Sequence, residues 1–162
     1  MGKNESKNKI KSIDITDAGI ARNIFELQRV SYQNEAKLIG SYEIPPLMEP
    51  LNQLKCCGET FLVFIEMGEI VAALSYKREN LVVDIHRMMV HPKHFRKGIA
   101  GQLLTYLEKL EADAQEFIVS TGAANTPAVR LYENQGFKKV GEIIVGNGLT
   151  LAQFFKPGKN SL

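Results

Sequence analysis

The segment Val90 to Leu104, which reads VHPKHFRKGIAGQLL, contains the residues best suited to bind a phosphate. A strand pattern leads into a short basic loop with the small residues Gly98, Ala100 and Gly101, and the loop opens directly into a helix pattern. The first turn of a helix has free backbone N–H groups and the positive end of the helix dipole, and small residues let an anion approach them. The segment therefore predicts a phosphate-binding turn, although an ordinary, closely packed strand-to-helix turn would have the same pattern.

The positive charge near this turn suits one phosphate group better than a long polyanion. Lys93, Arg96 and Lys97 lie in or next to the loop, but 20 basic and 18 acidic residues leave the chain a formal net charge of only +2. Such a small surplus does not indicate a surface that binds nucleic acid or an anionic membrane. The loop also lacks the GK[ST] ending of a Walker A loop and the three-glycine fingerprint of dinucleotide-binding folds.

Two side chains that could move a proton precede the turn. Residues 81–90 form a strand pattern, and its alternation would place Asp84, His86, Met88 and Val90 on one face. Histidine, with an unperturbed pKa of about 6.5, suits a general base, whereas Asp84 would need burial or a water chain to act as one. A histidine that is only packed or hydrogen-bonded is the alternative.

The remaining histidines and the cysteines predict no further site. His91 and His94 are three residues apart but have no third ligand at a suitable spacing, and the basic loop disfavours a cation, so we expect no metal. Cys56 and Cys57 are adjacent, and neighbouring cysteines rarely reach the geometry of a disulfide. Two reduced thiols are typical of a cytoplasmic protein.

One mixed α/β domain is expected to position these groups. A chain of 162 residues with 44% hydrophobic and 23% charged residues is typical of a single globular domain. No apolar run approaches the ~20 residues that cross a membrane, and the first residues lack the apolar segment of a secretory signal. We therefore expect a soluble, cytoplasmic domain over residues 13–156, with polar tails at 1–12 and 157–162.

The periodicity of apolar residues predicts the element order β-α-α-β-β-β-α-β-α-β-β, which describes a mixed sheet and not a run of βαβ units. Thr16 and Asp17 are expected to cap the first helix, and Thr126 is expected to cap the last one. The proline-rich stretch 42–50 is expected to be a loop. The strands are expected near residues 9–16, 61–66, 70–76, 81–90, 116–121, 139–145 and 149–155.

Two motifs resemble the GNAT superfamily of acyl-CoA-dependent N-acetyltransferases. Its members carry [QR]-x-x-G-x-[GA] in the turn; Gly98 and Ala100 match the last two fixed positions, and Phe95 stands where Gln or Arg is usual. Downstream, NTPAVRLYENQGF fits the pattern N-x-x-A-x-x-L-Y-x-x-x-G-F at Asn125, Ala128, Leu131, Tyr132, Gly136 and Phe137. The resemblance implies a GNAT-like acyl-CoA N-acyltransferase fold.

The resemblance also implies acetyl-CoA as the co-substrate. Backbone N–H groups of residues 96–101 would bind its pyrophosphate, and the backbone of Met88 and Val90 would pair with its pantetheine arm like an added strand. The residues expected to contact it are Met88, Met89, Val90, Phe95, Arg96, Lys97, Gly98, Ile99, Ala100, Gly101, Asn125, Ala128 and Tyr132.

Acyl transfer from a thioester to an amine needs a neutral amine, a donor for the oxyanion and a proton for the departing thiolate. Tyr132 is expected to donate that proton, as the resemblance also implies, because a phenol pKa of about 10 is close to a thiol pKa of about 8.5. Helical spacing also allows Tyr132 to be simply a core aromatic residue. The N–H of Met89 or Val90 would bind the oxyanion, and His86 or Asp84 would accept the proton of the amine.

The predicted function is acetyl transfer to a primary amine of a small molecule or a protein. A catalytically silent acyl-CoA-binding module of the same fold is one alternative, and a phosphate-binding module for nucleotides or nucleic acid is another. By position alone, the residues expected to line the acceptor site are Tyr32, Tyr42, Glu43 and Phe154. A homodimer is compatible with the resemblance.

Overall fold

The computed structural model describes residues 9–40, 44–146 and 148–159. The predicted order of elements is confirmed, with two short additions: the helix Pro45–Met48, within the stretch predicted to be a loop, and the 3-10 helix Pro92–His94. The elements are β1 (Ile10–Ile13), α1 (Ala18–Ile39), α2 (Pro45–Met48), α3 (Leu51–Lys55), β2 (Thr60–Glu66), β3 (Glu69–Glu79), β4 (Val82–Val90), the 3-10 helix η1 (Pro92–His94), α4 (Ile99–Leu110), β5 (Glu116–Gly122), α5 (Thr126–Asn134), β6 (Lys138–Val145) and β7 (Leu149–Pro157).

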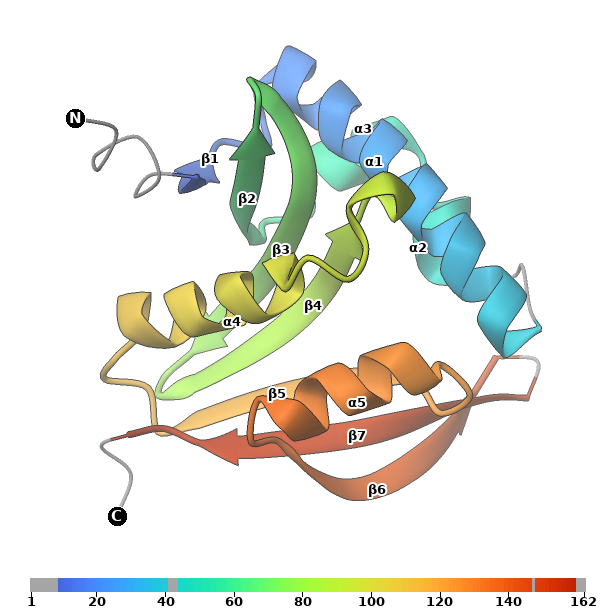
Figure 1. The fold of residues 1–162 in the computed structure, drawn as a ribbon, viewed down its shortest axis with the longest axis vertical. Coiled ribbons are helices and arrows are strands. Elements are labelled where there is room, and N and C mark those ends of the chain that lie inside the picture. The colour runs from blue at the N-terminus through green and yellow to red at the C-terminus, as the bar shows by residue number, and fades with distance from the viewer. Residues whose placement is uncertain (1–8, 41–43, 147, 160–162) are drawn as a thin grey trace.

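The strands form one mixed sheet in the order β1-β2-β3-β4-β5-β7-β6 (Figure 1). β4 and β5 are parallel neighbours, and the other neighbouring strands are antiparallel. The parallel pairing runs only from Val82 and Glu116 to Ile85 and Val119. Beyond that point the two strands diverge, so residues 86–90 form an open edge of β4.

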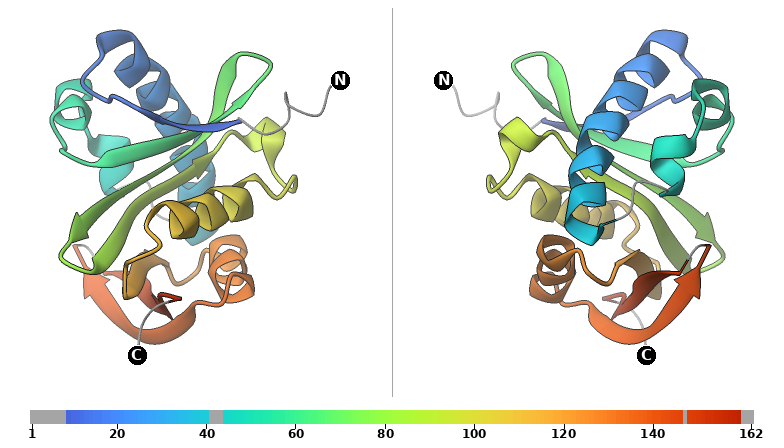
Figure 2. Two further views of the ribbon diagram at one scale, coloured as in Figure 1. Left: turned by 90° about the vertical axis from the view of Figure 1, so that its left-hand side faces the viewer. Right: turned by 90° about the vertical axis from the view of Figure 1, so that its right-hand side faces the viewer.

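Helices cover both faces of the sheet, with α1 and α4 on opposite sides (Figure 2). The core beneath α4 contains its buried residues Ile99, Leu103, Leu104 and Leu107, which lie at helical spacing. The second core lies beneath α1 and α3 on the other face. Within the described part of the chain, no helix has both the length and the apolar character that crossing a membrane would require.

A β-bulge interrupts the alternation of β4. Tyr76 of β3 pairs with Ile85, but the preceding residue of β3, Ser75, pairs with Arg87. His86 is therefore an extra residue in β4, without a counterpart in β3.

The bulge shifts the faces of the residues that follow it. Ile85 before the bulge and both Met88 and Val90 after it contribute to the core beneath α4. The prediction that Asp84 and His86 share a face with Met88 and Val90 is therefore wrong. Simple alternation does not count the extra residue, and Asp84 faces the α1 side instead.

Local features of the chain explain three further corrections. Asp17 caps α1, as predicted, but Asn125 and not Thr126 caps α5, through a hydrogen bond from the Ala128 N–H to its side chain at 3.2 Å. Part of the predicted loop at 42–50 is helical, because prolines at the start of α2 need no N–H donor there. The first three residues of β1 fall within the predicted tail 1–12, because this strand pairs with β2, and β7 extends through Pro157.

Candidate active site

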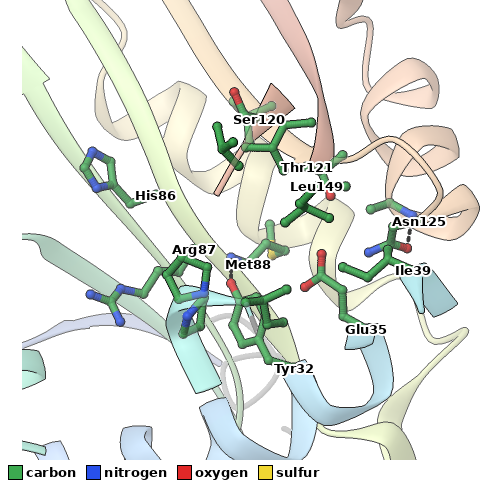
Figure 3. A pocket seen from close by; sticks show the side chains of 18 of the residues that line it. Tyr32, Glu35, Ile39, His86, Arg87, Met88, Ser120, Thr121, Asn125 and Leu149 are labelled. Carbon is green, nitrogen blue, oxygen red and sulfur yellow. Dashed lines mark hydrogen bonds between the residues drawn. The ribbon is translucent and has the colours of Figure 1, made fainter. Parts of the chain in front are cut away.

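A pocket of about 440 Å³ lies where β4 and β5 diverge (Figure 3). This volume is within the ordinary range for small-molecule sites. Its walls come from α1, β4, β5, α5 and the loop before α2, and they bring together Tyr32, Glu35, His86, Arg87 and Tyr132. Tyr42 and Glu43, predicted to line the acceptor site, lie outside the described residues.

The open edge of β4 presents two backbone N–H groups to side chains of α1. Met88 N–H donates to the Tyr32 hydroxyl at 3.3 Å, and Val90 N–H donates to Ser31 Oγ at 3.2 Å. His91 N–H donates to Val71 of β3 at 2.8 Å, so by alternation the Met89 N–H also faces β3.

The prediction that Met89 contacts the co-substrate is therefore wrong. Its N–H faces away from the open edge, and its side chain is completely buried in the core beneath α1. The N–H groups available at the open edge are those of Met88 and Val90.

Tyr132 is both a core aromatic residue and part of the pocket wall. It is 3% exposed, and its ring packs against Phe137 at 5.5 Å and Phe154 at 5.9 Å between centroids. Burial, and then the nearby charge of Glu35, raise the pKa of Tyr132 above its ordinary value, so the phenol stays protonated. Phe154, predicted to line the acceptor site, instead supports Tyr132 from within the core.

Glu35 is a pocket residue that the sequence analysis missed. It follows Tyr32 by one helical turn on α1, and its carboxyl group points into the pocket between Met88 and Asn125 (Figure 3). Burial raises the pKa of Glu35, and a hydrogen bond with the Asn125 side chain partly offsets this effect. The available signal was a carboxylate three residues after Tyr32, a spacing that puts both side chains on one face of a helix.

His86 and Asp84, predicted as candidate bases, do lie together. The Nε2 atom of His86 is 3.4 Å from the Asp84 carboxylate, and its Nδ1 atom is 3.6 Å from the Glu59 carboxylate. His86 lines the pocket, whereas the Asp84 side chain is 50% exposed. His86 therefore has two carboxylate neighbours on the α1 side of the sheet.

Arg87 is the centre of a buried polar network that the sequence analysis also missed. Its guanidinium donates to Glu49 at 2.5 and 3.0 Å, to Glu59 at 2.8 and 3.1 Å, and to Gln28 Oε1 at 2.7 Å. The Ser75 hydroxyl also donates to Glu59, at 2.6 Å. The network connects α1, the segment between α2 and α3, and the residue before β2 to the bulge of β4.

The predicted phosphate-binding turn has free donors. Arg96 and Gly98 both have left-handed backbone conformations, with φ of 63° and 73°. Within the described chain, no hydrogen bond from the backbone N–H groups of residues 96–101 to another residue is found. A Cβ at Gly101 would come within 2.8 Å of Gln135 Nε2, so α4 and α5 approach closely here, beside an open groove lined by both helices. The geometry suits a diphosphate.

The histidines and the aromatic residue around the turn are held locally or exposed. His91 Nδ1 accepts a hydrogen bond from Lys93 N–H at 3.1 Å, and His94 Nδ1 lies 3.3 Å from Lys97 Nζ. Phe95, at the position where the GNAT motif usually has Gln or Arg, is 40% exposed.

Comparisons with known proteins agree with this architecture. The model of the acetyltransferase (GNAT) family matches residues 22–137. The UPF0157 protein YqkA of Bacillus subtilis (strain 168) is 34% identical over 145 residues, which make up 90% of this chain and 42% of that protein. The chain thus spans less than half the length of the curated relatives that it matches.

Solved structures show the same fold at low sequence identity. The ribosomal-protein-S18-alanine N-acetyltransferase from Escherichia coli has a TM-score of 0.72 at 16% identity, covering 94% of this chain and 97% of its own. PaiA N-acetyltransferase from Thermoplasma acidophilum, in complex with coenzyme A, has a TM-score of 0.70 at 15% identity, covering 89% and 97%. Because the family model spans most of the chain and the fold agrees, this chain belongs to the acetyltransferase (GNAT) family.

Proposed function

We propose that this protein transfers an acetyl group from acetyl-CoA to a primary amine, which attacks the thioester directly. The observation that carries the proposal is the open edge of β4. There the N–H groups of Met88 and Val90 face the space left by β5, next to the pocket that Tyr132 lines.

Acetyl-CoA would lie along this edge, with its pyrophosphate at the start of α4. The unpaired N–H groups of residues 96–101 and the charges of Arg96 and Lys97 support that placement. The pantetheine arm would pair with the backbone of Met88 and Val90, in place of the hydroxyls of α1. The other proposed contacts are Phe95, Gly98, Ile99, Ala100, Gly101, Asn125, Ala128 and Tyr132.

The chemical roles follow from the groups around the pocket. The N–H of Val90 or Met88 would stabilise the oxyanion of the tetrahedral intermediate. Tyr132, kept protonated by its raised pKa, would give its proton to sulfur as the C–S bond breaks. For the proton of the amine, His86 with Asp84 is the base suggested by the sequence, acting through water.

Two measurements test the proposal. Acetyl-CoA at roughly 100 times its Kd should raise the melting temperature by about 5–10 °C, and free thiol should appear when primary amines are added. Small amines and peptide amines are assayed in parallel, because the acceptor can be of either class. Tyr132→Phe should keep the thermal shift and lose most of the thiol release.

The outcomes distinguish the alternative functions. A thermal shift with acetyl-CoA but no thiol release across a broad amine panel would indicate a catalytically silent acyl-CoA-binding module. A response to ATP or an oligonucleotide, but not to acetyl-CoA, would indicate a phosphate-binding module and refute the proposal.

A further inference from the structure

We infer that Glu35 of α1 binds the ammonium group of the acceptor and takes the proton that the amine must lose before it attacks the thioester. The inference rests on the proposed acetyl transfer and gives Glu35 the step for which the sequence suggested His86. The carboxyl group of Glu35 points into the pocket, between Met88 of the open edge and Asn125 at the start of α5 (Figure 3).

Glu35 is a pocket carboxylate without a cation beside it. The other two carboxylates that line the pocket, Glu49 and Glu59, both bind the guanidinium of Arg87. In the described ranges, no Lys, Arg or His forms an ion pair with Glu35. Because a partly buried carboxylate without a counter-charge is unfavourable, a bound ammonium ion would supply what this site lacks.

Glu35 also lies close to the groups that the reaction needs. After burial, its negative charge is the largest influence on the pKa of both Tyr32 and Tyr132, and it raises both. The Tyr32 hydroxyl in turn accepts the hydrogen bond from Met88 N–H. An ammonium ion on Glu35 would therefore be near both the proposed acid and the proposed oxyanion donor.

His86 is less well placed for this step. Both of its ring nitrogens face carboxylates, those of Asp84 and Glu59, at 3.4 and 3.6 Å. The bulge also puts it among the polar groups of the α1 side.

Every proton of the reaction is accounted for when Glu35 is the base. The ammonium ion gives one proton to the Glu35 carboxylate, and the nitrogen lone pair forms the bond to the thioester carbon. When the C–S bond breaks, sulfur takes the proton of Tyr132, and the second proton of the nitrogen restores Tyr132 as the amide forms. Glu35 then releases its proton to solvent, so an ammonium ion and a thioester yield an amide, a thiol and one proton.

The pocket also selects the kind of amine. Apolar side chains, including those of Ile39, Leu149 and Leu151, line it together with three carboxylates and one guanidinium. This combination suits a primary ammonium ion on a carbon chain. An amine with a free carboxylate on the neighbouring carbon would be repelled, so L-alaninamide should be acetylated faster than L-alanine.

The test compares Glu35→Gln with wild type over pH, with Glu35→Asp as the variant that keeps the carboxylate. Glu26→Gln is the matched control, because it makes the same change on the same helix at an exposed position. Thiol release is measured against amine concentration, and an acetyl-CoA thermal shift verifies that each variant is folded and binds the co-substrate.

The charged and titratable groups around Glu35 are Tyr32 and Tyr132, and farther along the pocket Glu49, Glu59, His86 and Arg87. Because burial raises the pKa of Glu35, its base form is reached above the usual carboxyl range, and kcat/KM for the amine should rise through that pKa.

We expect Glu35→Gln to lower kcat/KM for the amine by about 100-fold or more at pH 7 and to raise KM. The deficit should shrink at high pH, where the free amine is already neutral, and Glu35→Asp should recover part of it. A Glu35→Gln deficit that is absent, or equal at every pH, would overturn the inference and leave the proposed function intact. Failure of the wild type to release thiol with any amine would overturn both.

Discussion

Replacing Arg87 with methionine should destabilise the fold far more than a surface substitution, because Arg87 neutralises two buried carboxylates. The side chains of Arg87, Glu59 and Glu49 are 8%, 7% and 14% exposed. Four hydrogen bonds of 2.5–3.1 Å join the guanidinium to these carboxylates. Removing one partner of such a buried pair costs about 3–5 kcal/mol, which for a chain of this length lowers the melting temperature by roughly 6–20 °C.

The loss of stability in Arg87→Met should depend on pH, and the ionisation of Glu59 determines in which direction. Burial alone would raise the pKa of Glu59, but hydrogen bonds from Arg87 and Ser75 hold it below its ordinary value. A carboxylate of this kind stabilises the fold above its unfolded-state pKa, and the contribution is lost as pH falls through the folded-state pKa. The difference between wild type and Arg87→Met should therefore be largest at neutral pH and shrink below about pH 4.

Urea unfolding at pH 7 and at about pH 3 measures both effects. Combining Arg87→Met with Glu49→Gln and Glu59→Gln should recover part of the stability, because no uncompensated charge remains buried. Lys139→Met is the control; it breaks a surface ion pair with Glu142 and should cost less than about 1 kcal/mol. A loss for Arg87→Met as small as that of the control would refute the reasoning.

Three further substitutions test the co-substrate site. Tyr132→Phe should lower kcat by about 100-fold or more. Because burial raises the pKa of Tyr132 above its ordinary value of about 10, the wild-type rate should not fall with rising pH up to about pH 10. Gly98→Val and the control Gly68→Val both force a side chain into a left-handed conformation, and calorimetry should show acetyl-CoA binding weakened by about tenfold or more only for Gly98→Val. Tyr32→Phe removes the hydroxyl that holds Met88 N–H and should tighten acetyl-CoA binding by up to about tenfold; an unchanged Kd would show that the co-substrate does not displace this hydroxyl.

Much of the fold could be predicted because its elements depend on neighbouring residues. The apolar spacing of residues 99–110 describes α4 from its first to its last residue, and Gly68 lies in the turn between the strands predicted at 61–66 and 70–76. The turn before α4 was also recognisable, since small and basic residues within one short segment define it. Such features need no information about distant parts of the chain.

The features that escaped prediction depend on contacts between distant segments. The bulge at His86 can be seen only by comparing β4 with the register of β3. Arg87 meets Gln28 and Glu59 from 59 and 28 positions away, so nothing in its own neighbourhood indicates a buried network. Glu35 is an ordinary helical glutamate until α1 packs next to α5 and the open edge of β4.

The three pocket carboxylates have different roles, which depend on whether a cation pairs with them. Glu49 and Glu59 are neutralised by Arg87 and fix the wall that α1 shares with β4, so losing their partner should weaken the fold. Glu35 has no such partner, and a group with a raised pKa contributes less stability as pH rises through that value. Glu35→Gln should thus be at least as stable as wild type at pH 7 while losing activity, which is the trade-off expected of a carboxylate kept for its reactivity. A melting temperature well below that of wild type would instead assign Glu35 to the framework with Glu49 and Glu59.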